Sequence, residues 1–151
     1  TRRSSDLFVC SICGYVYEGE ELPEDFVFNA IALNCGVYYQ EKPNRKDMAS
    51  GLLNDLLPKG WTDKDLKMLN SYDKVKPGYP PVFLMTSNGD FLKEQVNYII
   101  PEFKKNNIPF ELHIYGSEDN VLGHVFHVNM RLKDAAICND EECAFFRRYQ
   151  K

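Results

Sequence analysis

The clearest structural signal in this chain is the stretch of residues 81–92, Pro-Val-Phe-Leu-Met-Thr-Ser-Asn-Gly-Asp-Phe-Leu. The apolar run from Val82 to Thr86 is short, follows Pro80 and Pro81, and ends in the turn-forming residues Ser-Asn-Gly. A continuous apolar run of this length between turn signals is typical of a buried strand. Asp90 comes directly after the turn, so the stretch predicts a buried strand with an acidic side chain just beyond its carboxyl end.

Downstream of this strand, the chain continues with alternating elements. Apolar residues at helical spacing predict an amphipathic helix from Phe91 to Asn106. A second strand is expected from Phe110 to Tyr115, followed by a loop rich in Gly, Ser, Asp and Asn that leads to His124. A last helix is expected from about Val128 to Tyr149.

Upstream of residue 81, a strand and two helices are expected. The residues from Phe28 to Tyr39 are rich in Ile, Ala, Leu and Val, as in a buried strand. Residues 47–57 have apolar positions at helical spacing, and Thr62 with Asp65 forms a capping box for a second short helix. Strands that alternate with helices imply an α/β fold with a short parallel sheet of at least three strands, flanked by helices.

Asp90 and His124 hold comparable places in this layout, each in the loop that follows a strand. Groups beyond the carboxyl ends of neighbouring parallel strands can meet, because such strands lie about 4.8 Å apart. An aspartate that orients a histidine, and a histidine that takes a proton from a hydroxyl, are two of the three members of an acyl-transfer triad. The alternative is that Asp90 only caps the following helix and that His124 is an ordinary loop histidine.

Two segments resemble a known family. The segment 81–92, followed by Gln95, is similar to the acid-bearing segment of the α/β-hydrolase superfamily, in the esterase and lipase branch similar to hormone-sensitive lipase. Residues 112–115 and the later Gly-His-Val-Phe at 123–126 resemble the histidine segment of that branch. The resemblance extends over residues 28–149 in the same order and spacing.

The resemblance implies that Asp90 is the triad acid and His124 is the base. His127 is a poorer match for the base because no glycine precedes it, and His113 is expected to be a structural residue within a strand. The implied activity is that of a carboxylic ester hydrolase (esterase or lipase) acting on small-molecule esters, with no cofactor for the hydrolase part.

A hydrolase of this family also requires a serine on a Gly-x-Ser-x-Gly turn and an oxyanion loop of the His-Gly-Gly type. No serine of the 151 residues has glycine at both the second position before it and the second position after it. Ser50 precedes Gly51 but lies in a helical pattern. The chain is therefore expected to retain the acid and base without the nucleophile, and to be weak or inactive on its own.

The residues before the first strand resemble a different family. Residues 8–19, Phe-Val-Cys-Ser-Ile-Cys-Gly-Tyr-Val-Tyr-Glu-Gly, are similar to the first metal-binding knuckle of rubredoxin and rubrerythrin. Cys10 and Cys13 would be its thiolate ligands for iron or zinc. The second knuckle of that family is missing, because phenylalanine and isoleucine stand at its cysteine positions, 28 and 31. Cys35 is a third candidate ligand.

The other two cysteines, Cys138 and Cys143, are expected to be thiols of the last helix. The sequence thus predicts two parts: a rubredoxin-like half-knuckle with a small β-ribbon over residues 1–27, and the C-terminal part of an α/β-hydrolase over residues 28–151. A fusion, a truncated gene or an assembled sequence would each explain the junction. Two other functions stay open: an iron-binding electron-transfer module, and a non-catalytic interaction protein that self-associates through an exposed sheet edge.

The composition of the chain limits the classes of partner that it is expected to bind. The net charge is −4, from 18 basic and 22 acidic residues, so the basic surface typical of nucleic-acid binding is not expected. No apolar run approaches the roughly 20 residues that span a bilayer. The polar first residues lack the apolar segment of an export signal, and the five cysteines are an odd number, which together favour the reducing cytoplasm.

Overall fold

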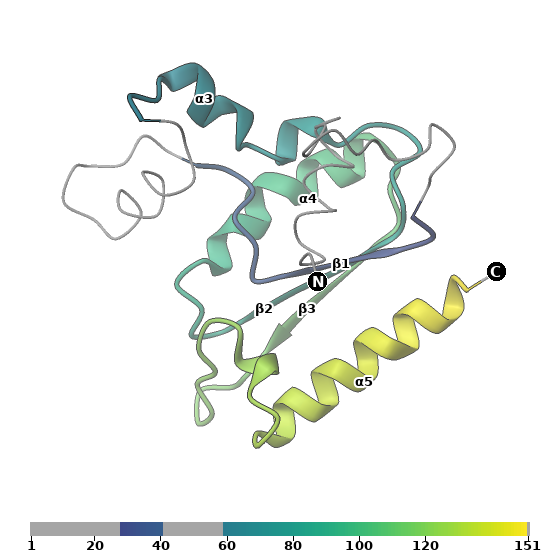
Figure 1. Ribbon diagram of the computed structural model, residues 1–151. Coiled ribbons are helices and arrows are strands. Elements are labelled where there is room, and N and C mark those ends of the chain that lie inside the picture. Colours follow the sequence, from purple (N-terminus) through teal and green to yellow (C-terminus); the bar gives the residue numbers. More distant parts are fainter. Residues whose placement is uncertain (1–27, 41–58, 151) are drawn as a thin grey trace.

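The computed structural model describes residues 28–40 and 59–150 (Figure 1). The predicted β-ribbon, the knuckle with Cys10 and Cys13, and the predicted helix at 47–57 lie outside the described residues. The division of the chain at residue 27 therefore stays a prediction.

A parallel sheet of three strands forms the centre of the described part. The strands are β1 (Ile31–Asn34), β2 (Val82–Ser87) and β3 (Phe110–Tyr115), and they lie in the order β1-β2-β3. Both pairs are parallel, with Val82 opposite Ile31 on one side and opposite Phe110 on the other. This confirms the predicted α/β fold with a short parallel sheet.

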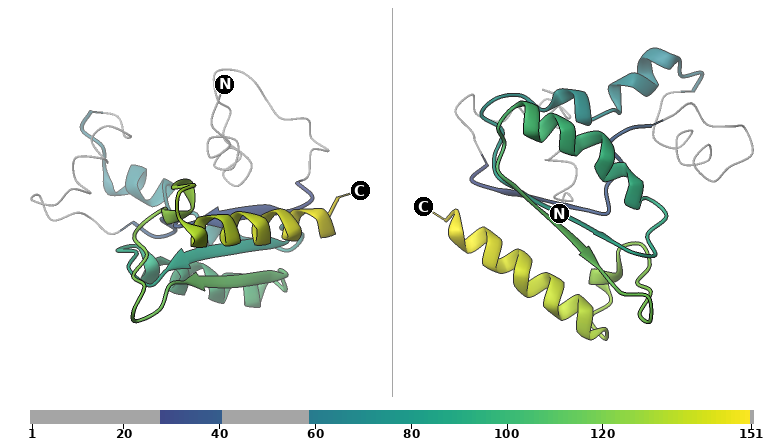
Figure 2. Two further views of the ribbon diagram at one scale, coloured as in Figure 1. Left: turned by 90° about the horizontal axis from the view of Figure 1, so that it is seen from below. Right: turned by 180° about the vertical axis from the view of Figure 1, so that it is seen from behind.

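The helix α4 (Val96–Lys105) covers one face of the sheet, and α5 (Lys133–Arg148) covers the other (Figure 2). Alternate residues of β2 point to opposite faces, as the strand period requires. Val82 and Leu84 belong to a core on the α4 side, whereas Phe83 and Met85 belong to a core on the α5 side. All six residues of β2 are buried, which explains why its sequence is a continuous apolar run.

Several predicted bounds differ from the structure. The strand expected from Phe28 to Tyr39 is only the four residues of β1, because Cys35 adopts a left-handed conformation, φ 52°, and turns the chain out of the strand. The helix expected from Phe91 begins later, after a 3-10 turn at Lys93–Gln95. The last helix is likewise preceded by a separate 3-10 turn at Phe126–Val128.

The capped short helix α3 (Asp63–Met68) is present as predicted. The backbone N–H of Thr62 donates to Oδ2 of Asp65 at 2.8 Å, which satisfies a group that the helix itself leaves without a partner. Within residues 28–40 and 59–150, no helix combines the length and the apolar character needed to cross a bilayer.

Candidate functional site

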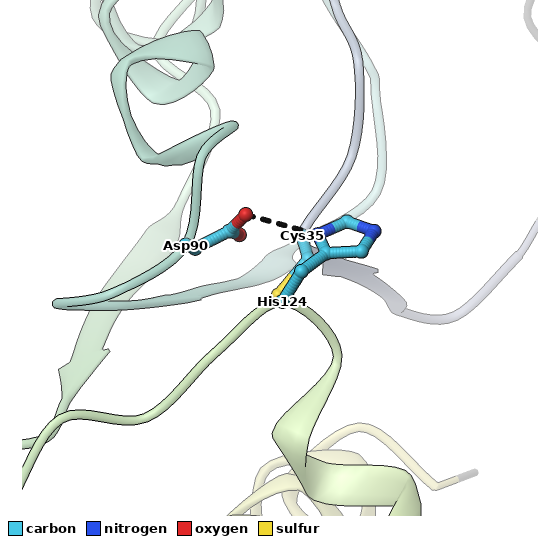
Figure 3. Close-up of side chains that lie close together, drawn as sticks. All are labelled: Cys35, Asp90 and His124. Carbon is cyan, nitrogen blue, oxygen red and sulfur yellow. Dashed lines mark hydrogen bonds and ion pairs between the residues drawn. The ribbon is translucent and has the colours of Figure 1, made fainter. Parts of the chain in front are cut away.

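Asp90 and His124 meet at the carboxyl edge of the sheet (Figure 3). Asp90 lies three residues after the end of β2, and His124 lies in the loop between β3 and α5. The Nδ1 atom of His124 is 2.9 Å from Oδ1 of Asp90. The structure thus brings together the two residues that the sequence singled out, although 34 positions separate them along the chain.

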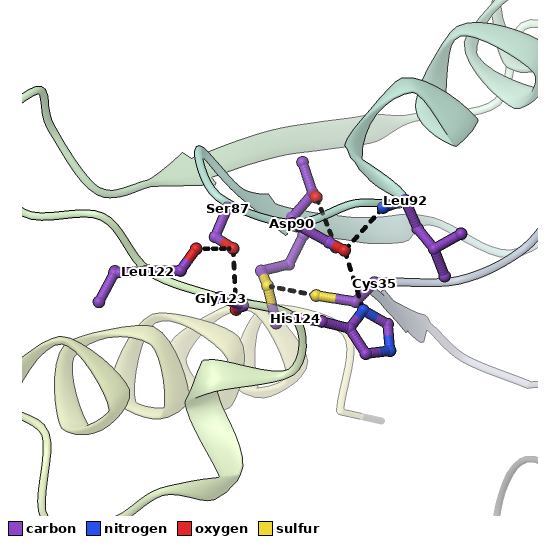
Figure 4. A network of polar contacts seen from close by, with 9 residues as sticks. Cys35, Ser87, Asp90, Leu92, Leu122, Gly123 and His124 are labelled. Atoms are coloured by element: carbon purple, nitrogen blue, oxygen red, sulfur yellow. Dashed lines mark hydrogen bonds and ion pairs between the residues drawn. The ribbon is translucent and has the colours of Figure 1, made fainter. Parts of the chain in front are cut away.

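The contact exists because the loop after β2 is hydrogen-bonded to the loop before His124 (Figure 4). The buried hydroxyl of Ser87 donates to the carbonyl oxygens of Leu122 and Gly123, at 2.8 and 3.1 Å. The N–H of Gly89 donates to the same Leu122 oxygen at 3.0 Å. These bonds fix the backbone of the two residues that precede His124.

Asn88 joins the same two loops through its side chain. Its Oδ1 accepts a hydrogen bond from the N–H of Leu122 at 2.9 Å, and its amide nitrogen donates to the carbonyl oxygen of Ser117 at 2.6 Å. Gly116 allows this approach: its φ is 99°, and a Cβ there would lie 2.2 Å from Oδ1 of Asn88. Sequence reasoning missed Ser87 and Asn88, whose only signal was a position beside Asp90.

Asp90 is buried, with a relative exposure of 2%, yet its carboxylate has several donors. Oδ2 accepts from the hydroxyl of Thr86 at 3.0 Å, and Oδ1 accepts from the N–H of Leu92 at 2.9 Å. Burial raises the pKa of Asp90, but hydrogen bonds from Leu92, Cys35, His124 and Thr86 outweigh it and hold the pKa below its ordinary value.

An ionised carboxylate can only accept hydrogen bonds, so Nδ1 of His124 must be the donor in this pair. In the neutral ring, Nε2 then keeps its lone pair and can accept a proton. The His124 side chain is 31% exposed, whereas that of Asp90 is inaccessible. The arrangement is therefore a base with access to solvent, held in one tautomer by a buried acid.

Phe91 lies beside the imidazole. The ring centroids of Phe91 and His124 are 4.7 Å apart, and the Phe91 side chain is 74% exposed. An exposed aromatic ring next to a proton acceptor gives the site an apolar wall on its open side.

Cys35 is the third polar side chain of the site, and sequence reasoning did not place it there. Ligand atoms of Cys35, Asp90 and His124 all lie within 4.8 Å of one another. Cys35 directly follows β1, so it lies at the same edge of the sheet as the other two. Burial, together with the neighbouring Asp90, raises the pKa of the Cys35 thiol to about 12, although the N–H of Val125 opposes this. The thiol is therefore neutral near pH 7.

The other two histidines of the chain have different surroundings. His113 lies in β3, where its ring stacks on Phe83 at a centroid distance of 4.4 Å, as expected for a structural residue. Burial lowers the pKa of His127, and its Nδ1 is buried without a hydrogen-bond partner. Neither histidine has an aspartate as an ion-pair partner among the described residues.

No family model matches this chain, and no curated protein matches it. Several solved structures, however, do match this chain. Esterase B from Lactobacillus rhamnosis HN001 aligns with a TM-score of 0.66 and 23% identity, over 83% of this chain and 42% of the esterase. The same esterase inhibited by a C4-C4 SN3 tributyrin phosphonate aligns with a TM-score of 0.67 and 25% identity, over 83% of this chain and 41% of the esterase.

The propionate-bound esterase Est2 from Thermogutta terrifontis aligns with a TM-score of 0.52 and 18% identity, over 91% of this chain and 52% of Est2. The chain thus spans about half, or less, of the length of the esterases that it matches. These likenesses show that the three-stranded parallel sheet and its flanking helices correspond to part of an esterase α/β-hydrolase fold.

Proposed function

We propose that this chain carries the acid and the base of a Ser-His-Asp triad for the hydrolysis of carboxylic esters, with Asp90 as the acid and His124 as the base. The observation that carries the proposal is the 2.9 Å hydrogen bond between Nδ1 of His124 and Oδ1 of Asp90. It lies at the carboxyl edge of a parallel sheet, where α/β folds bind their ligands. The partial esterase fold supports the same assignment.

In this role, Nε2 of His124 takes the proton of the attacking hydroxyl group and later returns it to the leaving alcohol. Asp90 stabilises the imidazolium that forms in between, without itself taking the proton. The 151 residues contain no Gly-x-Ser-x-Gly turn, so water is the hydroxyl available to the chain by itself. General-base assistance of this kind contributes only about 10²- to 10⁴-fold. The chain alone is therefore a slow esterase.

The substrates we propose are esters of short carboxylic acids. Two of the structural neighbours are an esterase inhibited by a C4-C4 SN3 tributyrin phosphonate and an esterase with bound propionate. In this chain, the exposed ring of Phe91 beside His124 is suited to contact a short alkyl group.

The test is the hydrolysis of p-nitrophenyl butyrate by the 151-residue chain at neutral pH. The wild-type rate should exceed that of buffer, and His124→Ala should lower it to the buffer rate. Asp90→Asn should lower it at least ~10-fold, because an amide no longer favours the active tautomer or stabilises the imidazolium. His113→Ala is the matched control, since His113 has a similar exposure but no contact with Asp90, and it should keep the wild-type rate.

Circular dichroism of each variant shows whether it is folded. A wild-type rate equal to that of buffer, or a folded His124→Ala variant with the wild-type rate, would contradict the proposal.

A further inference from the structure

We propose that Cys35, Asp90 and His124 form a binding site for a zinc-like divalent cation. The three side chains come from three different segments, after β1, after β2 and after β3, and they converge at one point (Figure 3). Their ligand atoms lie within 4.8 Å of one another. This inference rests on geometry and donor chemistry and does not depend on ester hydrolysis.

The donor set selects the class of metal. A thiolate, an imidazole and a carboxylate are together typical ligands of zinc, whereas magnesium and calcium prefer sites made of oxygen atoms. Zinc holds such ligands at about 2.0–2.3 Å. Ligand atoms within 4.8 Å of one another can therefore surround one ion.

The charges of the site also favour a dication. Asp90 is buried and ionised, and a bound cation displaces the thiol proton of Cys35 to solvent, which leaves a thiolate as ligand. Two anionic ligands and one neutral imidazole then balance a charge of +2. A neutral assembly has a much smaller cost of burial than an isolated charge.

Tyr38 adds a further observation at this place. Its side chain is 3% exposed, and its hydroxyl is buried without a hydrogen-bond partner. Burial raises the pKa of Tyr38, the backbone of Gly36 opposes this, and the ionised carboxylate of Asp90 raises it further, so the negative potential of Asp90 extends to the phenol. A cation bound beside Asp90 would offset that potential.

The open side of the site provides entry. Cys35 and Asp90 are buried, while the His124 side chain is 31% exposed, so a cation enters past the imidazole and retains water as its fourth ligand. The cation also replaces the hydrogen bond between Asp90 and His124. Cation binding and proton transfer by His124 therefore exclude each other.

The experiment measures binding of Co²⁺ and Zn²⁺ to the 151-residue chain, independently of any enzymatic activity. Co²⁺ reports thiolate ligation through its near-ultraviolet charge-transfer absorption, and Zn²⁺ competition gives the affinity. Because Cys10 and Cys13 are also candidate ligands, the measurements use the Cys10→Ser/Cys13→Ser variant beside the wild type. Cys143→Ser is the matched control, since Cys143 is exposed on α5.

We expect the Cys10→Ser/Cys13→Ser variant to bind one Co²⁺ with the charge-transfer band. Adding Cys35→Ser should abolish the band, and adding His124→Ala should weaken binding at least ~100-fold, since loss of a ligand exceeds the 10–100-fold effect of an outer partner. Cys143→Ser should change neither. His124 is partly exposed, so its variant keeps the test valid even where Cys35→Ser fails to fold.

Two results would overturn the proposal. One is the absence of the band from the Cys10→Ser/Cys13→Ser variant, which would assign any metal to those cysteines alone. The other is a band and an affinity that persist after Cys35→Ser and His124→Ala, which would place the thiolate elsewhere.

Discussion

The backbone N–H of Gly89 donates to the carbonyl oxygen of Leu122 at 3.0 Å, and the two backbones approach so closely that no side chain fits between them. A Cβ on Gly89 would lie 2.8 Å from that oxygen. Since Asp90 and His124 each lie within two residues of this contact, the approach determines whether acid and base can meet.

Gly89→Ala should therefore separate the two loops. The nearby side chain of Val121 can rotate away from the new methyl group, but the Leu122 carbonyl belongs to the backbone and can only move with its loop. We expect a loss of about 1–3 kcal/mol in the free energy of unfolding, measured with urea, together with a slower ester hydrolysis.

Gly123→Ala is the matched control. A Cβ on Gly123 has no heavy atom within 4 Å, so this change should stay within about 0.5 kcal/mol of the wild type. Equal stabilities and rates for the two variants would contradict the role assigned to Gly89.

Thr86→Val should destabilise the chain by about 1.5–3 kcal/mol, because it removes a buried hydrogen bond to a charged carboxylate without changing the shape of the side chain. Thr86→Ser keeps the hydroxyl and should therefore retain most of the stability that Thr86→Val loses. Urea unfolding of both variants measures the difference. A Thr86→Val variant as stable as the wild type would show that Asp90 does not need this donor.

The sequence predicted β2 and β3 well, because residues within and beside each strand determine where it begins and ends. β3 has the predicted bounds, and β2 extends only one residue further, since proline and glycine delimit each apolar run. Their parallel pairing places both following loops at one edge, which made the contact of Asp90 with His124 predictable.

The sequence could not predict the surroundings of Cys35. Apolar residues continue on both sides of position 35, from residue 28 to residue 39, so the left-handed conformation of Cys35 that ends β1 interrupts a segment whose composition favours one long strand. Its approach to Asp90 and His124 depends on tertiary pairing between distant segments. The one available signal was Gly36, which directly follows Cys35 and could have marked a turn there.

Acid should reduce the contribution of Asp90 to stability. Its folded-state pKa lies below the ordinary value of 3.8, so the contribution is present above about pH 4 and is lost as the pH falls through the folded-state pKa. The difference in unfolding free energy between the wild type and Asp90→Asn should therefore shrink from pH 5 towards pH 2. A difference that does not change with pH would contradict this electrostatic account.

Alkylation should distinguish the exposed cysteine of the described residues from the two buried ones. Burial raises the pKa of Cys35 to about 12 and that of Cys138 to about 11, and the thiolate is the reactive form. With iodoacetamide at pH 8, Cys143 should react readily in the folded chain, whereas Cys35 and Cys138 should react only after denaturation. Peptide mass spectrometry gives the order, and modification of Cys35 as fast as Cys143 would show that its thiol is accessible.

The coupling between Asp90 and His124 can be measured by NMR of the His124 ring in the ¹⁵N-labelled 151-residue chain. The hydrogen bond to Asp90 predicts that the neutral ring carries its proton on Nδ1 and leaves Nε2 unprotonated, and that Asp90→Asn alters this tautomer balance. A neutral ring protonated on Nε2, or a spectrum unchanged by Asp90→Asn, would show that Asp90 and His124 are not coupled as acid and base.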